Sequence, residues 1–386
     1  MRILQVISTI DPACGGPPVI VTRLAAAQAA LGHEVQLLTY DTPNSQAYWN
    51  ESRECLPGAK DVQATFLPVG GKLEKLFGGT ARKMVRSMIG QMDVVHLHNV
   101  WESILRVTAV EARAANVPYT ILLNGMLDAH SMGNKSIKKQ LAMTLGYRSM
   151  FNGAAALHMG NEDEKRLIEP LNLTAPPLIV PNGITFEEID PLPEPGTFRA
   201  EHPELGDHPY ILFLSRLQYK KGLDYLAESF AIFASKESNT HLVVAGPDEG
   251  MREEFEQRIA RAGVGDRVHV VGPLYAQQKY AAFRDAACFC LPTRQEGFTV
   301  VVNETLACGV PMVITEGAHR PDVGEADAGI IVNLDEQEIA DALLRLMADP
   351  ELRERLGRNG RAHAEKNLTW KAVAQQMVDA YASFRS

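Results

Sequence analysis

The segment 291–311 contains two glutamates, Glu296 and Glu304, with seven residues between them. Glu296 precedes a glycine in an expected loop after a buried strand. Glu304 lies in the helix that follows, which should begin near Thr299 and end at Gly309. At about 1.5 Å of rise per residue, Glu304 is roughly 7.5 Å along that helix. One hydroxyl-rich ligand can therefore meet both carboxylates while its phosphates lie at the helix N-terminus.

Two cations occur at a comparable position earlier in the chain. Arg216 follows the end of an expected strand, and Lys221 with Gly222 introduces the next helix. Open α/β sheets bind ligands at the carboxyl ends of their strands. A guanidinium and an ammonium at that edge suit a diphosphate, and the alternative is a pair of ordinary surface charges in a loop.

The first turn after a strand carries the paired glycines Gly15 and Gly16. The turn lacks the G-x-G-x-x-G pattern of a dinucleotide site. Paired glycines before a helix still allow backbone amides to approach a phosphate, at the positive end of the helix dipole. A plain tight turn is the alternative interpretation.

Short apolar runs alternate with longer amphipathic stretches along the whole chain. Their near-continuous Val, Ile and Leu content predicts parallel strands buried on both faces, with helices between them. The alternation runs twice, which predicts an α/β protein with two Rossmann-like, doubly wound domains facing an interdomain cleft. The expected strands are 3–7, 34–39, 62–67, 93–97, 119–123, 154–158, 178–180, 210–215, 241–246, 267–271, 287–291, 312–315 and 329–332.

The boundary between the expected domains follows the segment 181–184. Residues 186–209 contain several prolines and acids, a composition typical of a linker. A final amphipathic helix begins at Trp370. The prediction is one domain from 1–183 plus the C-terminal helix 370–386, and a second domain from 184–369.

Composition excludes several classes of protein. Hydrophobic residues make up 46% and charged residues 22% of the chain, which is typical of a globular protein, and no apolar run has the length of a membrane span. Five cysteines without framework spacing favour a reduced, cytoplasmic setting. The sequence contains no stripe of basic and aromatic residues that would indicate a nucleic acid partner. The sequence contains no cluster of metal-ligating side chains at a strand end, so we expect no bound metal ion.

Taken together, these motifs resemble glycosyltransferase family four, whose members have the GT-B fold. The resemblance rests on the spacing of Glu296 and Glu304, on Arg216 with Lys221, on the Gly15-Gly16 turn and on the segment 181–183. It covers nearly the whole chain. It implies a retaining enzyme that uses a nucleotide-sugar donor and requires no metal cofactor.

The resemblance also implies roles for residues on the donor side. Glu296 would hold hydroxyls of the donor sugar, Glu304 would hold the ribose, and Arg216 with Lys221 would neutralise the diphosphate leaving group. The remaining donor-binding positions are backbone or apolar contacts at Gly15, Gly16, Leu274, Gly297, Phe298 and Thr299. Catalysis would fall to Glu296, Arg216 and Lys221, with their charges in place of a metal ion.

The acceptor side is less sharply defined. Candidate acceptor-binding residues follow two expected strands of the first domain and are His98, Asn99, Trp101, Asn124, Asp128 and His130. Many relatives carry His or Arg where this chain has Asn124. The region 71–92 combines basic and apolar residues, so it fits either a membrane surface for lipid-linked acceptors or an ordinary amphipathic helix.

The resulting hypothesis is a hexosyltransferase that uses a UDP-sugar in preference to a GDP-sugar. Its acceptor would be a glycan or a lipid-linked glycan in polysaccharide or glycoconjugate biosynthesis. We expect it in the cytoplasm, with peripheral contact at the inner face of the membrane through the region 71–92. The alternatives are a non-catalytic subunit that binds a nucleotide-sugar and a nucleotide-sugar epimerase.

Overall fold

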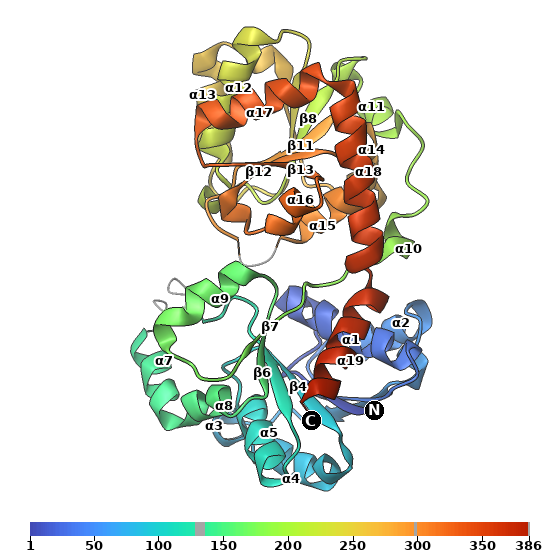
Figure 1. Cartoon of the computed structure of the whole chain (residues 1–386), viewed down its shortest axis with the longest axis vertical. Helices are drawn as coiled ribbons and strands as arrows, with labels where there is room; N and C mark the ends of the chain where they lie inside the picture. The colour runs from blue at the N-terminus through green and yellow to red at the C-terminus, as the bar shows by residue number, and fades with distance from the viewer. Residues whose placement is uncertain (128–135, 297–298, 385–386) are drawn as a thin grey trace. The chain divides into compact units, whose positions relative to one another are not determined.

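The computed structural model describes residues 1–127, 136–296 and 299–384 (Figure 1). The chain divides into two compact units. Unit 1 consists of Met1–Gly183 with Trp370–Ser386, and unit 2 consists of Ile184–Thr369. Each unit is built on its own parallel sheet, which confirms the predicted class of two Rossmann-like domains. No helix within the described ranges is long and apolar enough to cross a membrane.

Unit 1 contains a seven-stranded sheet in the order β3-β2-β1-β4-β5-β6-β7. Strand β1 pairs in parallel with both β2 and β4, so Ile3 lies opposite Val35 on one side and Val94 on the other. The order of the strands reverses there, which is where open α/β sheets bind ligands. The strands are β1 (Arg2–Val6), β2 (Glu34–Tyr40), β3 (Gln63–Leu67), β4 (Val94–His98), β5 (Tyr119–Leu122), β6 (Ala156–Met159) and β7 (Pro177–Ile179).

Helices connect these strands, and the last helix of the chain completes the unit. Helix α19 packs against α1, and its Val373, Met377 and Tyr381 are buried with Ile3 and other residues of the core (Figure 1). The described helices of unit 1 are α1 (Gly16–Ala30), α2 (Ser45–Cys55), α3 (Lys72–Phe77), α4 (Gly79–Met88), α5 (Ser103–Ala114), α7 (Ser136–Ala142), α8 (Arg148–Asn152), α9 (Glu162–Ile168) and α19 (Trp370–Ser383).

Unit 2 contains a six-stranded sheet in the order β10-β9-β8-β11-β12-β13. Strand β8 pairs with both β9 and β11, so the strand order reverses at β8 as it does at β1. The strands are β8 (Tyr210–Leu214), β9 (His241–Ala245), β10 (Val268–Gly272), β11 (Cys288–Leu291), β12 (Met312–Thr315) and β13 (Gly329–Val332). The described helices are α10 (Phe186–Ile189), α11 (Thr197–Glu201), α12 (Leu223–Lys236), α13 (Arg252–Ala262), α14 (Gln277–Asp285), α15 (Val300–Ala307), α16 (Pro321–Glu325), α17 (Glu336–Ala348) and α18 (Pro350–Asn367).

The expectation of a linker over 186–209 was wrong. This segment forms α10 and α11, and its Phe198 and Leu205 are fully buried in the core of unit 2. The carboxylate of Asp285 accepts hydrogen bonds from the backbone amides of Gly196 and Phe198. The prolines therefore separate short helices within a packed segment. Proline content alone does not reveal that the few apolar residues of this segment are buried in the core.

A chain of polar side chains crosses the core of unit 1. His96 on β4 is 2.7 Å from the hydroxyl of Tyr381 and 3.2 Å from His158 on β6. His98 Nε2 is 2.6 Å from Gln5 Oε1. All three imidazoles are buried. Burial lowers the pKa of His98 to about 3 and that of His158 to about 4. The three rings therefore fold as neutral groups.

We expect unit 1 to lose stability as the pH falls from about 6.5 toward 4. In the unfolded chain these histidines take up a proton near pH 6.5, whereas in the fold they resist it, so acid favours the unfolded state. At pH 5 the lowered pKa of His98 alone reduces the free energy of unfolding by roughly 2 kcal/mol. Hydrogen exchange of the full chain at pH 7 and pH 5 measures the effect. The protection factors of the β4 amides should be lower at pH 5, while those of the β11 amides in unit 2 serve as the internal control. Equal protection of β4 at both pH values would contradict the prediction.

Candidate functional site

A cavity of about 360 Å³ lies in unit 2 at the carboxyl ends of its central strands. The loops that follow β8, β9, β10 and β11 form its walls together with the first turns of α14 and α15. Its volume lies in the usual range for small-molecule sites. It brings together six of the predicted donor residues, and it is lined by Leu214, Ser215, Arg216, Lys221, Gly246, Pro247, Pro273, Leu274, Tyr275, Lys279, Glu296, Thr299, Val300, Val301 and Glu304.

An ion pair occupies the inner end of this cavity. Lys221 Nζ lies 2.6 Å from Glu296 Oε1, and both side chains are about nine-tenths buried. The hydroxyl of Thr293 lies 2.9 Å from the same carboxylate oxygen and 2.8 Å from the carbonyl oxygen of Lys220, and these two acceptors share its single proton. Two donors thus hold Oε1, and no side chain in the described ranges hydrogen bonds Oε2. The arrangement fixes the carboxylate and leaves an oxygen with which it can accept a ligand hydroxyl.

A second ion pair lies on α15. Helix α15 begins at Val300 with Thr299 as its N-cap and is followed by Gly309 in a left-handed conformation, which confirms the predicted start and end. Glu304 Oε1 is 2.5 Å from Nζ of Lys279 in the first turn of α14. Each of the two predicted glutamates is therefore paired with a lysine of the same cavity.

Arg216 lies at the outer side of the cavity. Its guanidinium donates to both carboxylate oxygens of Glu249, at 3.1 and 3.2 Å, and its side chain is 57% exposed. An exposed pair of this kind contributes little to stability. Arg216 can therefore exchange Glu249 for an anionic ligand at small cost.

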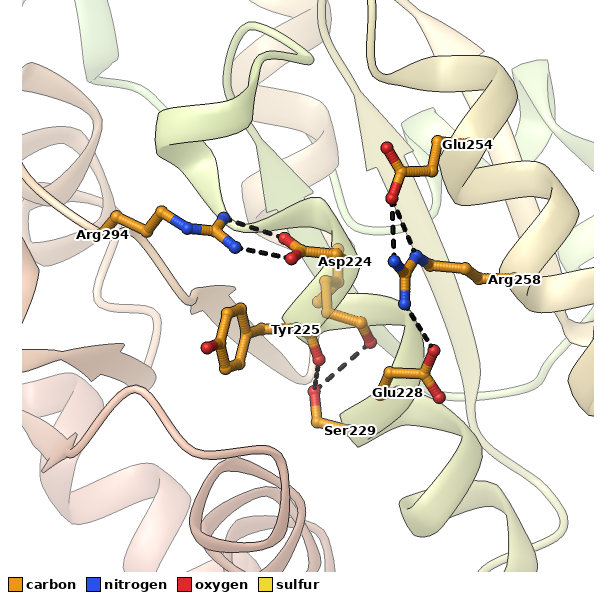
Figure 2. Close-up of polar contacts among 8 residues, drawn as sticks. Asp224, Tyr225, Glu228, Ser229, Glu254, Arg258 and Arg294 are labelled. Atoms are coloured by element: carbon orange, nitrogen blue, oxygen red, sulfur yellow. Dashed lines mark hydrogen bonds and ion pairs between the residues drawn. The ribbon is translucent and has the colours of Figure 1, made fainter.

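Arg294 joins the loop that carries Glu296 to the turn that carries Lys221. Its guanidinium donates to both oxygens of Asp224 at 2.9 and 2.5 Å, as Figure 2 shows, and also to the carbonyl of Tyr219. Burial by itself would raise the pKa of Asp224, but the contacts with Arg294 outweigh it and the pKa is lowered. In the same view Arg258 of α13 bonds Glu254 and reaches Glu228 on α12. The bidentate Arg294–Asp224 pair sets the separation of the two loops.

The two loops also approach each other through their backbones. Gly222 follows Lys221 with φ of 69°, and a Cβ atom there would lie 1.8 Å from the carbonyl oxygen of Pro292. The backbone amide of Arg294 donates to the carbonyl of Lys220, which also lies 2.8 Å from the hydroxyl of Thr293. Only glycine fits at position 222, because both the conformation and the space exclude a side chain.

We therefore expect Gly222→Ala to lower the free energy of unfolding of unit 2 by about 3 kcal/mol or more. Gly263→Ala is the matched control, since Gly263 has a φ of 70° but nothing within 4 Å of an added Cβ. It should cost only about 1 kcal/mol. Urea unfolding of the two variants measures the difference. Equal losses of stability would show that the close approach to Pro292 is unimportant.

The predicted residues of unit 1 lie at several places. Gly15 and Gly16 are exposed at the start of α1, with open space around them. Asn99 and Asn124 follow β4 and β5, both with positive φ, and the Asn124 amide donates to Asn99 Oδ1 over 3.0 Å. Trp101 lines a separate cavity of unit 1. These positions surround the carboxyl ends of the central strands.

The expectation that His98 contacts an acceptor needs correction. Its ring is fully buried, and Gln5 at 2.6 Å holds it within the polar chain of the core. His98 therefore supports β4 from inside. The remaining candidates, Asp128 and His130 in unit 1 and Gly297 and Phe298 in unit 2, lie outside the described residues.

Comparisons with known proteins agree with this architecture. Residues 15–183 match the family described as glycosyl transferase 4-like domain, and residues 196–363 match glycosyl transferases group 1. The chain is a family four glycosyltransferase. It is 28% identical to the D-inositol 3-phosphate glycosyltransferase of Xylanimonas cellulosilytica, over 95% of this chain and 91% of that protein.

Solved structures share the GT-B fold of this glycosyltransferase. Anabaena HepE in complex with UDP and glucose has a TM-score of 0.72 at 16% identity, over 99% of this chain and 100% of that chain. Sucrose-phosphate synthase from Thermosynechococcus elongatus has a TM-score of 0.69 at 20% identity, over 100% of this chain and 99% of that one. At such identities the likeness establishes the fold alone.

Sequence analysis of this glycosyltransferase missed Lys279 and Thr293. Lys279 is the third residue of α14, where a positive charge opposes the helix dipole, so its position is itself a signal of an anionic partner. Thr293 precedes Glu296 by three residues in an expected loop and carried no comparable signal.

Proposed function

We propose that this glycosyltransferase transfers a hexose from a nucleotide-sugar with retention of anomeric configuration, and that unit 2 binds the donor. The observation that carries the proposal is the pair of lysine–glutamate contacts in one cavity, Lys221 with Glu296 and Lys279 with Glu304. Each carboxylate can accept ligand hydroxyls while its lysine presents further N–H donors to phosphate.

The reaction breaks the bond between the anomeric carbon and the diphosphate oxygen. Negative charge develops on that oxygen, and Lys221 and Arg216 would stabilise it; a preorganised group of this kind contributes about 3 kcal/mol. Glu296 is held by Lys221 and Thr293, an arrangement suited to binding hydroxyls rather than to nucleophilic attack. The acceptor oxygen would therefore attack on the face that the diphosphate leaves. Its proton would pass to the departing phosphate, which gives the glycoside and the nucleoside diphosphate.

A UDP-sugar is the proposed donor, in preference to a GDP-sugar. Glu304 would hold the ribose, and Leu274 with Tyr275 would flank the base at the end of β10. The structural neighbour HepE, whose complex contains UDP and glucose, supports the choice. Isothermal titration with UDP and GDP tests it, and tighter binding of GDP would contradict it.

The proposed acceptor is a glycan or a lipid-linked glycan of polysaccharide or glycoconjugate biosynthesis, bound by unit 1. We place the enzyme in the cytoplasm, with the region 71–92 at the inner face of the membrane. Leu73, Leu76 and Phe77 of that region are more than 60% exposed, beside Lys72 and Lys75. Apolar and basic groups together suit an anionic lipid surface. Sedimentation with anionic phospholipid vesicles tests the contact, and absence of the protein from the pellet would contradict it.

A screen of nucleotide-sugars tests the function as a whole. Full-length protein should bind a UDP-hexose, transfer its sugar to a glycan acceptor, and give a product whose anomeric NMR signals match the donor configuration. Binding without transfer or hydrolysis would favour the non-catalytic alternative. Conversion of the donor to an isomeric nucleotide-sugar would favour an epimerase.

Transfer should persist in excess chelator. The lysines and Arg216 already supply positive charge at the expected diphosphate position, which is what a divalent ion provides in other transferases. The initial rate of transfer should be the same, within about twofold, in excess EDTA and in buffer with added Mg²⁺ or Mn²⁺. Loss of activity that Mg²⁺ or Mn²⁺ restores would contradict metal independence.

A further inference from the structure

Unit 1 contains a cavity of about 370 Å³ at the carboxyl ends of β1, β2 and β4. It occupies the same position on this sheet, where the strand order reverses, as the proposed donor cavity does in unit 2. Its walls are mainly apolar and hydroxylic. The charged residues among its lining are Glu74, Lys75 and Glu102. Two carboxylates and one ammonium are an unusual lining for a site that binds an anion.

Glu74 is committed to the fold. Its carboxylate accepts hydrogen bonds from the hydroxyl of Tyr40 and from the backbone amides of Thr80 and Ala81, at 2.8 to 3.1 Å. Three donors largely satisfy one carboxylate. Lys75, the cation, is exposed at the mouth of the cavity.

Glu102 differs from Glu74 in having an oxygen without a partner. Its Oε2 is buried and makes no hydrogen bond within the described ranges, and burial raises its pKa. The adjacent Trp101 has a buried indole N–H that also lacks a partner there. Buried polar groups are rarely left unpaired, because each has lost its bonds to water. An unpaired acceptor and an unpaired donor on neighbouring residues of one cavity wall indicate a ligand that supplies both.

Glu102 also decides which charge the ligand can carry. It is the N-cap residue of α5, a 12-residue helix whose positive end would otherwise attract an anion. The Glu102 side chain makes no capping hydrogen bond with that helix end, but its carboxylate lines the same cavity. A phosphate brought into the cavity would therefore meet this carboxyl group, so its binding would cost either repulsion between two negative charges or the uptake of a proton by Glu102.

We propose that this cavity is the acceptor subsite and that it takes an uncharged sugar or polyol ring, whose hydroxyls bond Glu102 and Trp101, while excluding a ring that bears a phosphate. This rests on the function proposed above and narrows its acceptor class. The curated relative from Xylanimonas cellulosilytica is named for an inositol phosphate. The acceptor proposed for this chain therefore differs in charge from the compound for which that relative is named.

Matched pairs of probes test the proposal. Saturation-transfer NMR titrations of the full chain, with UDP saturating unit 2, compare myo-inositol with inositol 3-phosphate and glucose with glucose 6-phosphate. In at least one pair the neutral member should bind about 10-fold more tightly or better. Glu102→Gln should reduce that preference to less than about 3-fold, since the repelling charge is gone. Glu162→Gln, on the exposed face of α9, is the matched control and should leave the ratio unchanged.

Several outcomes would overturn the proposal. These are equal or tighter binding of the phosphates, no binding of either neutral probe, or an unchanged ratio in Glu102→Gln. Trp101→Phe keeps an aromatic side chain, although a smaller one, and removes the indole N–H. It should weaken neutral probes several-fold, so it serves if Glu102→Gln fails to fold. Calorimetry with UDP separates this proposal from the function. If UDP does not bind, the proposed function fails, whereas if UDP binds and the probes behave otherwise, only the acceptor assignment fails.

Discussion

Replacement of Lys221 by methionine should lower the turnover number by roughly 100- to 1000-fold. Methionine fills similar space but cannot stabilise the charge that develops on the leaving diphosphate, and loss of one such group has this effect in other enzymes. Steady-state kinetics with a saturating UDP-sugar measures it. Lys220→Met is the matched control, because Lys220 precedes Lys221 in the same turn but does not line the cavity. It should keep near-normal turnover.

The same substitution leaves Glu296 buried without its cation, which by itself destabilises a protein by about 3 kcal/mol or more. The double variant Lys221→Met with Glu296→Gln removes that stray charge. It should recover much of the lost melting temperature, yet its turnover should be well below that of Glu296→Gln alone. Turnover equal to that of Glu296→Gln alone would show that Lys221 acts only by holding Glu296 and the fold, and not on the leaving group.

Glu296→Gln and Glu304→Gln should have different kinetic consequences. Glu296 is held at the inner end of the cavity by Lys221 and Thr293, where a sugar hydroxyl contact can strengthen in the transition state. Its loss should lower kcat by roughly 100-fold and weaken discrimination among donor sugars. Glu304 would contact the ribose equally in the ground state and in the transition state. Its loss should raise KM for the donor by about 10-fold with little change in kcat.

Free UDP distinguishes the two carboxylates without any chemistry, because it has a ribose and no sugar. Calorimetry should show weaker UDP binding in Glu304→Gln and nearly unchanged binding in Glu296→Gln. The reverse order would exchange their roles. Glu316→Gln, in the turn after β12 and outside the cavity lining, is a control that should affect neither constant.

Periodicity and glycine placement predicted the fold well. Every expected strand is present, and its ends agree with the structure to within one or two residues. Strands buried on both faces are easily recognised because they consist of continuous apolar runs. The beginning of α15 at Val300 was predictable for a related reason, since the apolar run of the helix starts there. The segment 186–209 was mispredicted because its packing depends on a few buried residues such as Phe198.

The site was predictable in its residues but not in its pairing. Lys221 and Glu296 were each placed at a strand end, but they lie 75 positions apart, and their contact depends on how closely Gly222 approaches Pro292. His98 was assigned to the wrong environment. A histidine at a strand end is compatible with either a ligand or a core role, and only the position of Gln5 decides between them.

The return of α19 to unit 1 has a consequence for biosynthesis. Residues 370–383 leave the ribosome only after all of 184–369, which at ~5–20 residues per second takes on the order of 10 to 40 s. Throughout that interval Ile3 and Val21 lack the cover of Met377 and Tyr381, and His96 lacks its hydroxyl partner. Unit 2 is continuous in sequence and needs no later segment. The half of the protein that is translated first is therefore the half that finishes folding last.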